Sequence, residues 1–190
     1  MASSTPLDHL QQIQELNRAF LGLLQMRLQG GQPCFGLPAT ARPALRRATH
    51  ELIEAVALFP RALFRLAIAP DERRERGDSS SYHDEAEHDL VLSMLLATRH
   101  ASRQSAYQAR LLLGLAGDDV ARLGALALVD LQRLAGTPGV LQCALRERHW
   151  FWQGLLTATR PELRRQLTLM ALQPGVAVEW PTRRPPHASA

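Results

Sequence analysis

Arginine is the residue type in this sequence with the clearest capacity for binding chemistry. All 22 basic residues are arginine and none is lysine. A guanidinium group donates two parallel hydrogen bonds to a phosphate and stays charged at physiological pH, so clusters of exposed arginines suit a nucleic-acid backbone. An ordinary solvated helix face is the alternative for each cluster. The candidate DNA-binding residues are Arg42, Arg46, Arg47, Arg160, Arg164 and Arg165.

A short run of acids and histidines at residues 83–88 is the strongest pattern for metal chemistry. On a helix it would place His83 beside Glu87 and Asp84 beside His88, and such side chains ligate zinc or other divalent ions. Acids are also favoured in the first turn of a helix, where they face the positive end of its dipole. We favour the helix start and expect neither a metal site nor a cofactor.

Patterns that would indicate catalysis are missing from the sequence. It contains no glycine-rich phosphate loop, no nucleophile elbow and no cysteine–histidine pair in a strand context. Cys34 and Cys143 are too few for a disulfide framework or a four-cysteine zinc site, and we expect both to be buried as small hydrophobic residues. We therefore do not expect an enzyme.

Three consecutive aromatic residues, Trp150, Phe151 and Trp152, indicate a contact surface. A single helix face cannot bury all three, so at least one should point toward a partner or toward another part of the chain. Tryptophan is enriched at the energetic centres of protein interfaces. A broad contact within the chain is the equal alternative. The candidate partner-interface residues are Asn17, Phe20, Trp150 and Trp152.

Composition favours a helical protein. The chain has 190 residues, enough for one domain or two small ones, and 34 leucines against 10 isoleucines and valines together. No apolar run is long enough for a membrane span, and the first residues lack the pattern of a secretory signal, so we expect a cytoplasmic protein without a membrane partner. The net charge of +4 permits nucleic-acid contact without establishing it.

Apolar periodicity and glycine or proline breaks predict the order of elements. We expect helices over 7–29, about 40–59, 84–113, 118–134 and 159–172. A short element of open type is expected over 61–69, a linker over 70–81 and a turn over 136–139. The segment 140–154 is predicted to be helical, although its aromatic cluster leaves the type open. Residues 174–190 are expected to be disordered.

The two halves of the chain resemble each other. An offset of 78 residues pairs Gly36 with Gly114 and Pro60 with Pro138, so the same kinds of break occur at the same points of both halves. Upstream, an offset of 74 aligns the helices better and pairs Phe20 with Met94. This self-similarity indicates an internal duplication.

Both halves resemble FlhD, a subunit of the flagellar master transcriptional regulator. The first unit, residues 7–69, is similar to the first helix of that family at Ile13, Glu15, Leu16, Asn17, Phe20, Leu21, Leu24, Gln25 and Leu28. The second unit, residues 82–173, matches the family's order and spacing at Leu92, Ser93, Leu95, Leu96, Leu113, Gly114, Leu115, Asp118, Asp119, Leu123, Leu131, Leu134, Val140 and Cys143.

The resemblance implies an all-α protein in which two FlhD-like helical repeats pack as an intramolecular pseudo-dimer, followed by the tail. Family members are homodimers that assemble with the zinc-bearing subunit FlhC into a promoter-binding activator. The resemblance therefore implies a FlhC-type partner, promoter DNA contacted within the complex, and possible self-association. Cys143 matches a family cysteine but Arg65 occupies the corresponding position of the first unit, so a symmetric disulfide is impossible. The alternative function is a helical interaction module, a scaffold or antagonist, that does not bind DNA.

Overall fold

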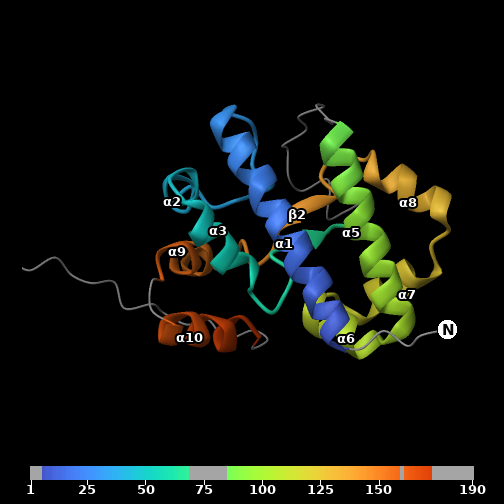
Figure 1. Ribbon diagram of the computed structural model, residues 1–190. Helices are drawn as coiled ribbons and strands as arrows, with labels where there is room; N and C mark the ends of the chain where they lie inside the picture. Colours follow the sequence, from blue (N-terminus) through green and yellow to red (C-terminus); the bar gives the residue numbers. More distant parts are fainter. Residues whose placement is uncertain (1–5, 69–84, 159–160, 173–190) are drawn as a thin grey trace, which may run out of the picture.

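The computed structural model describes residues 6–68, 85–158 and 161–172, and within them the chain is mostly helical (Figure 1). This confirms the all-α expectation at the level of fold class. In chain order the elements are α1 (Pro6–Gln29), α2 (Arg42–Arg46), α3 (His50–Ala57), β1 (Phe64–Leu66), α5 (Glu85–Gln104), α6 (Ala106–Leu113), α7 (Gly117–Ala125), α8 (Leu128–Ala135), β2 (Leu141–Cys143), α9 (His149–Thr157) and α10 (Pro161–Leu172).

The long helix α1 runs through the middle of the molecule (Figure 1). Its apolar residues recur at three- and four-residue steps, so one face is buried along its length, at Ile13, Phe20, Leu24 and Leu28. The expected range 7–29 is confirmed, and Gly31, with φ of 67°, follows the end of the helix. α2, α3, α5 and α6 all pack against α1.

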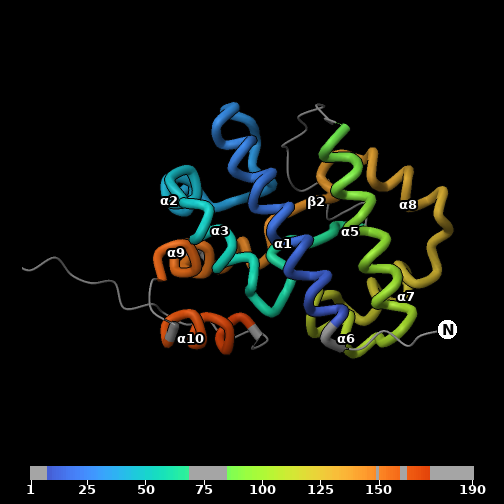
Figure 2. The backbone as a smooth tube through the Cα atoms, viewed as in Figure 1, coloured from blue at the N-terminus to red at the C-terminus, as the bar shows by residue number. Residues whose placement is uncertain are grey.

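Segments far apart in the sequence meet at a two-stranded antiparallel sheet (Figure 2). β1 pairs with β2 so that Phe64 lies opposite Cys143, Arg65 opposite Gln142 and Leu66 opposite Leu141. β1 occupies part of the segment 61–69 whose type the sequence left open. The sheet joins the first half of the chain to the second at the centre of the fold.

A buried ion pair joins the same two halves at one end of α1. Arg27 of α1 donates to the carboxylate of Glu87 on α5, and both side chains are less than a tenth exposed. The Arg27 guanidinium also donates to the carbonyl of Pro33 and lies 4.4 Å from the centre of the Phe35 ring. Its charge is thus matched by a carboxylate, a carbonyl and an aromatic face at once.

The carboxyl end of α10 is held by two arginines from other parts of the chain. Arg61 donates to the carbonyl of Ala171 at 2.9 Å, and Arg148 donates to that of Met170 at 2.7 Å. Cationic groups are favoured at this end of a helix because its last carbonyls have no partner within the helix. Burial, and then the nearby Arg148 charge, lowers the pKa of Arg61.

Three predicted helices are each divided in two. The range 40–59 contains α2 and α3, the range 84–113 contains α5 and α6, and the range 118–134 contains α7 and most of α8. Thr49 and Ser105 cause two of these breaks, because each leaves the helical conformation and its hydroxyl accepts a backbone N–H of the next helix. The third break, at Leu126 and Ala127, has no capping side chain.

The predicted helix over 140–154 is wrong in its first part, which forms β2 and a turn before α9 begins at His149. Long-range backbone bonds hold this segment extended: Cys143 donates to Phe35 at 2.7 Å, and Ala144 donates to Leu63 at 2.8 Å. The predicted turn at 136–139 is confirmed. The linker 70–81, the tail 174–190 and residues 83 and 84 of the acid–histidine run lie outside the described residues.

Candidate functional site

The first arginine cluster lies on and beside α2 and is exposed. The three side chains donate to backbone carbonyls: Arg42 to Leu37, Arg46 to Leu28 and Arg47 to Pro43. None of them forms an ion pair with a carboxylate in the described part of the chain. These three neighbouring arginines therefore form a cluster of positive charge without a carboxylate partner among the described residues. Each guanidinium also keeps further N–H groups that can donate to an external anion.

The second arginine cluster is only partly described. Arg165 on α10 is exposed, and Arg164 donates to the carbonyl of Ala158 at 3.0 Å. Arg160 lies outside the described residues. α9 contacts both α2 and α10, and the three helices lie together on one side of the molecule (Figure 1). The fold thus places the described arginines of both clusters on elements of the same side.

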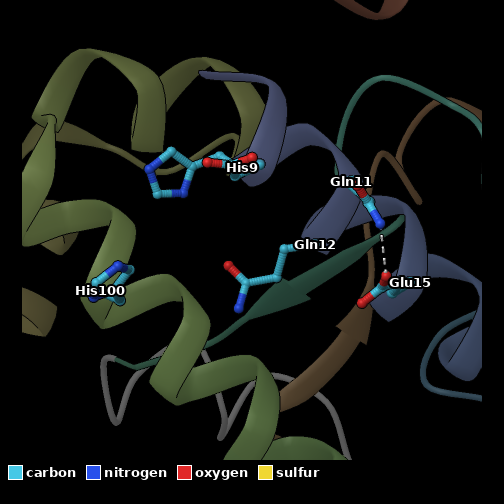
Figure 3. A pocket seen from close by; sticks show the side chains of 6 residues that line it. His9, Gln11, Gln12, Glu15 and His100 are labelled. Carbon is cyan, nitrogen blue, oxygen red and sulfur yellow. Dashed lines mark hydrogen bonds between the residues drawn. The ribbon is translucent and has the colours of Figure 1, made fainter. Parts of the chain in front are cut away.

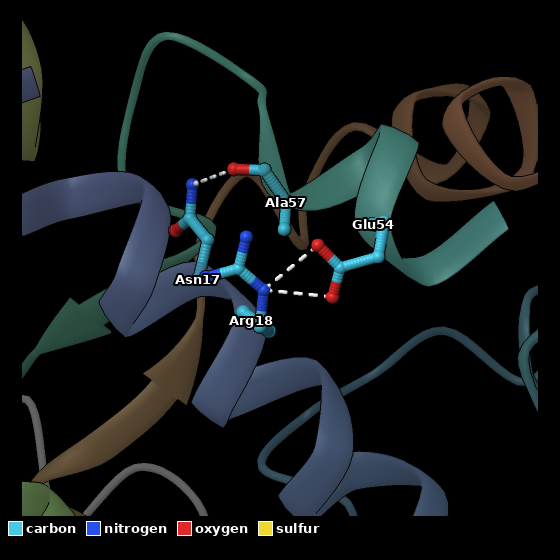
Figure 4. Close-up of polar contacts among 4 residues, drawn as sticks. All are labelled: Asn17, Arg18, Glu54 and Ala57. Carbon is cyan, nitrogen blue, oxygen red and sulfur yellow. Dashed lines mark hydrogen bonds and ion pairs between the residues drawn. The ribbon is translucent and has the colours of Figure 1, made fainter. Parts of the chain in front are cut away.

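The partner-interface prediction for Asn17 is wrong, because its side chain is completely buried. Its amide nitrogen donates to the carbonyls of Ala57, Phe59 and Arg61, at 3.4, 3.3 and 3.0 Å, and its amide oxygen accepts the N–H of Leu63 at 2.8 Å. Figure 4 shows the amide directed at the Ala57 carbonyl. Asn17 therefore fixes the chain between α3 and β1 instead of meeting a partner.

The next residue along α1 makes the exposed counterpart of this contact. Arg18 donates to both carboxylate oxygens of Glu54 on α3, at 2.7 and 2.9 Å (Figure 4). The hydrogen bond from Arg18 lowers the pKa of Glu54. Asn17 therefore attaches the end of α3 to α1 by buried hydrogen bonds, and Arg18 attaches α3 to α1 by an exposed ion pair.

Two of the three aromatic candidates, Phe20 and Trp152, are also interior residues. Phe20 and Trp152 have no exposed surface, and the Trp152 indole donates to the carbonyl of Ala144 at 2.7 Å. Trp150 is partly buried and packs against Phe151. Phe151 and Trp152 are both fully buried, and Trp150 partly, because α9 is covered by α2 and α3 and also by α10. The contact within the chain is therefore the correct alternative for Trp152.

An exposed apolar corner between α7 and α8 was missed in the sequence. Leu128 and Val129 begin α8 and are 52% and 62% exposed, beside exposed Ala125 and Ala127. Leu128 and Val129 both fall within the predicted helix 118–134, and apolar residues of such a helix are ordinarily expected to be buried. Contiguous exposed apolar side chains are a feature of many protein contact surfaces.

A polar pocket lies between α1 and α5 (Figure 3). His9 of α1 is buried, and its Nε2 lies 2.6 Å from the Gln104 Oε1 of α5. The Gln104 Nε2 lies 2.7 Å from the Nε2 of His100, so one amide connects both imidazoles. The cavity measures about 380 Å³ and is lined by Asp8, His9, Gln11, Gln12, Glu15 and His100.

The described residues contain no group of three or more histidine, cysteine, aspartate or glutamate side chains placed to hold a metal ion. Cys34 and Cys143 are both buried, as expected for small hydrophobic residues; they form no disulfide, and the Cys143 thiol donates to the Cys34 carbonyl at 3.6 Å. Burial raises the pKa of the Cys143 thiol well above its usual value. In the part of the chain that the structure describes, no helix is long and apolar enough to cross a membrane.

Comparison with known proteins gives no further assignment. No family model, no curated protein and no solved structure matches this chain.

Proposed function

We propose that this chain is a FlhD-like transcriptional regulator of motility genes, which acts in a complex with a FlhC-type partner on promoter DNA. The observation that carries the proposal is the correspondence between the two halves of the fold. In each half a long helix is followed by a shorter helix, an eight-residue helix and a three-residue strand, with α6 as an addition in the second half.

Equivalent elements occur at nearly constant offset. α3 and α8 both have eight residues, and they begin at His50 and Leu128, 78 positions apart. The offset is the one that aligns the two halves of the sequence. α3 packs on α1 as α8 packs on α5. Gly36 and Gly114, also 78 positions apart, both have positive φ, at 77° and 66°.

The sheet supports the same relation. Any antiparallel strand pair has a local two-fold axis, and here the axis passes between Arg65 and Gln142, which are 77 positions apart. This separation differs by one residue from the offset of the sequence repeat. Pairing of equivalent strands about a two-fold axis is what a dimer of one repeat would form. We therefore infer an intramolecular pseudo-dimer.

The DNA contact in this proposal comes from the arginines of α2 and α10. Exposed guanidinium groups without a carboxylate partner bind phosphate oxygens and position a complex without reading bases. A net charge of +4 over 190 residues gives too weak a field for tight binding by this chain alone. The proposal therefore requires the partner for promoter binding, and assigns the corner at Leu128 and Val129 to that partner.

The alternative function is a helical interaction module that binds its partner without DNA. The same exposed corner favours it, because a protein contact there needs no nucleic acid. Co-purification with a FlhC-type subunit, followed by a promoter-DNA mobility assay, separates the two. Partner capture with a partner-dependent DNA shift supports the regulator; capture without any DNA shift supports the interaction module. If the FlhC-type subunit is not captured, the result contradicts both the regulator and the interaction module as partners of that subunit.

A further inference from the structure

The pocket between α1 and α5 has a fixed wall. The Gln104 amide lies within hydrogen-bond distance of both imidazoles, with its Oε1 2.6 Å from the His9 Nε2 and its Nε2 2.7 Å from the His100 Nε2. The two rings are 6.0 Å apart and tilted by 48°. The His9–Gln104 bond joins α1 to α5 and holds the two sides of the cavity at a set separation, while the Gln104–His100 bond lies within α5 and orients the second ring.

Other groups of the pocket keep their hydrogen-bonding capacity for a ligand. The Gln12 amide extends between His100 and Glu15 (Figure 3) and makes no hydrogen bond to a described residue. The Glu15 carboxylate accepts one bond, at 3.3 Å from Gln11, which leaves acceptor sites on both oxygens. These groups offer amide and carboxylate oxygens beside imidazole faces.

The charge of the pocket is opposite to that of the whole chain. Two of its six lining residues, Asp8 and Glu15, are acids and none is arginine, although the chain carries 22 arginines. Such a lining favours a cationic ligand. Since no metal-holding group exists among the described residues, an organic cation suits the pocket better than a bare metal ion.

We propose that this pocket binds a guanidinium group. A planar guanidinium donates in two directions to carboxylate and amide oxygens, and it stacks on flat ring faces, which a compact ammonium group does less well. Glu15 and Gln12 supply the oxygens, and the imidazoles of His9 and His100 supply the flat faces. The group can come from an arginine side chain of another protein or from a small guanidinium compound. This inference is independent of the proposed DNA function.

The test is a titration of the full-length protein, followed by NMR of the Gln12 side-chain amide and the His100 ring. The probes are agmatine, a blocked glycine–arginine–glycine peptide, and the same peptide with neutral citrulline in place of arginine. We expect both guanidinium probes to bind with a Kd on the order of 1 mM, as their size allows, and the citrulline peptide not to bind. Tighter binding of the arginine peptide than of agmatine identifies a protein as the source of the group, and the reverse order identifies a small molecule.

Two variants keep the test specific. Glu15→Gln should weaken guanidinium binding about tenfold, because a charge-assisted bond is lost, and Gln12→Ala should weaken it less. Glu85→Gln, at the other end of α5, is the matched control and should leave binding unchanged. Both Glu15 and Gln12 are exposed, so the variants should melt like the parent protein. Equal binding of the citrulline peptide, or unchanged affinity in Glu15→Gln, overturns the proposal.

Discussion

At the residue scale, Asn17 is the side chain on which most of the first half depends. Its replacement by alanine would leave two buried carbonyls, one partly buried carbonyl and the buried N–H of Leu63 without this partner. We expect Asn17→Ala to lower the free energy of unfolding by about 2–4 kcal/mol in urea titration. Gln14→Ala is the control on the same helix, because Gln14 makes one exposed bond, to Leu58. Equal losses in the two variants would contradict the role given to Asn17.

The Arg18–Glu54 pair predicts a pH dependence with a definite sign. Since the bond from Arg18 lowers the pKa of folded Glu54, it stabilises the protein above the ordinary carboxylate range. That stabilisation is lost as the pH falls through the lowered pKa. Glu54→Gln should therefore make the melting temperature less sensitive to pH on the acid side, by a small amount because the pair is exposed. A steeper acid loss in the variant would be inconsistent with the pair.

Residue-scale chemistry was only partly predictable from the sequence. The exposure of Arg42, Arg46 and Arg47 was predictable, because a cluster of like charges on a helix is rarely buried. The role of Asn17 was not, since its partners lie some 40 residues away in a turn whose path the sequence does not specify. The pocket was missed for the same reason, because His100 reaches it from a different helix.

At the element scale, helix ends decide how the chain is divided. Thr49 caps α3 by accepting the N–H of Leu52, whereas α8 begins after Ala127 without a side-chain cap. We expect Thr49→Ala to destabilise the protein by about 1 kcal/mol and Ala127→Ser to stabilise it by about 0.5–1 kcal/mol. Thermal unfolding of the two variants checks the pair of expectations. A stabilising Thr49→Ala would contradict the cap.

Elements were predictable where local pattern decides them and unpredictable where distant contacts do. α1 was found nearly to the residue because its apolar spacing and its glycine end are local. Thr49 and Ser105 were not recognised as breaks, because leucine periodicity continues past both. β2 was mistaken for helix, since only its partners Phe35, Leu63 and β1 hold it extended.

At the scale of the whole molecule, the buried Arg27–Glu87 pair should couple the two halves. Removing one partner leaves a buried charge uncompensated, so Arg27→Met should cost about 3–5 kcal/mol. The double variant Arg27→Met, Glu87→Leu should recover much of this loss, because neither charge then remains buried. Urea unfolding of the parent, the two single variants Arg27→Met and Glu87→Leu, and the double variant gives the coupling free energy. Additive losses would show that the pair does not act as a unit.

The proposed DNA function requires that this chain contribute phosphate contacts to a partner-dependent complex on promoter DNA. The most direct test measures the salt dependence of DNA affinity for that complex, with and without the change of Arg42, Arg46 and Arg47 to glutamine. We expect the triple change to weaken binding to specific and random duplexes by similar factors, and each lost phosphate contact to reduce the salt slope by roughly one. An affinity and a salt slope both unaltered by the triple change would contradict it.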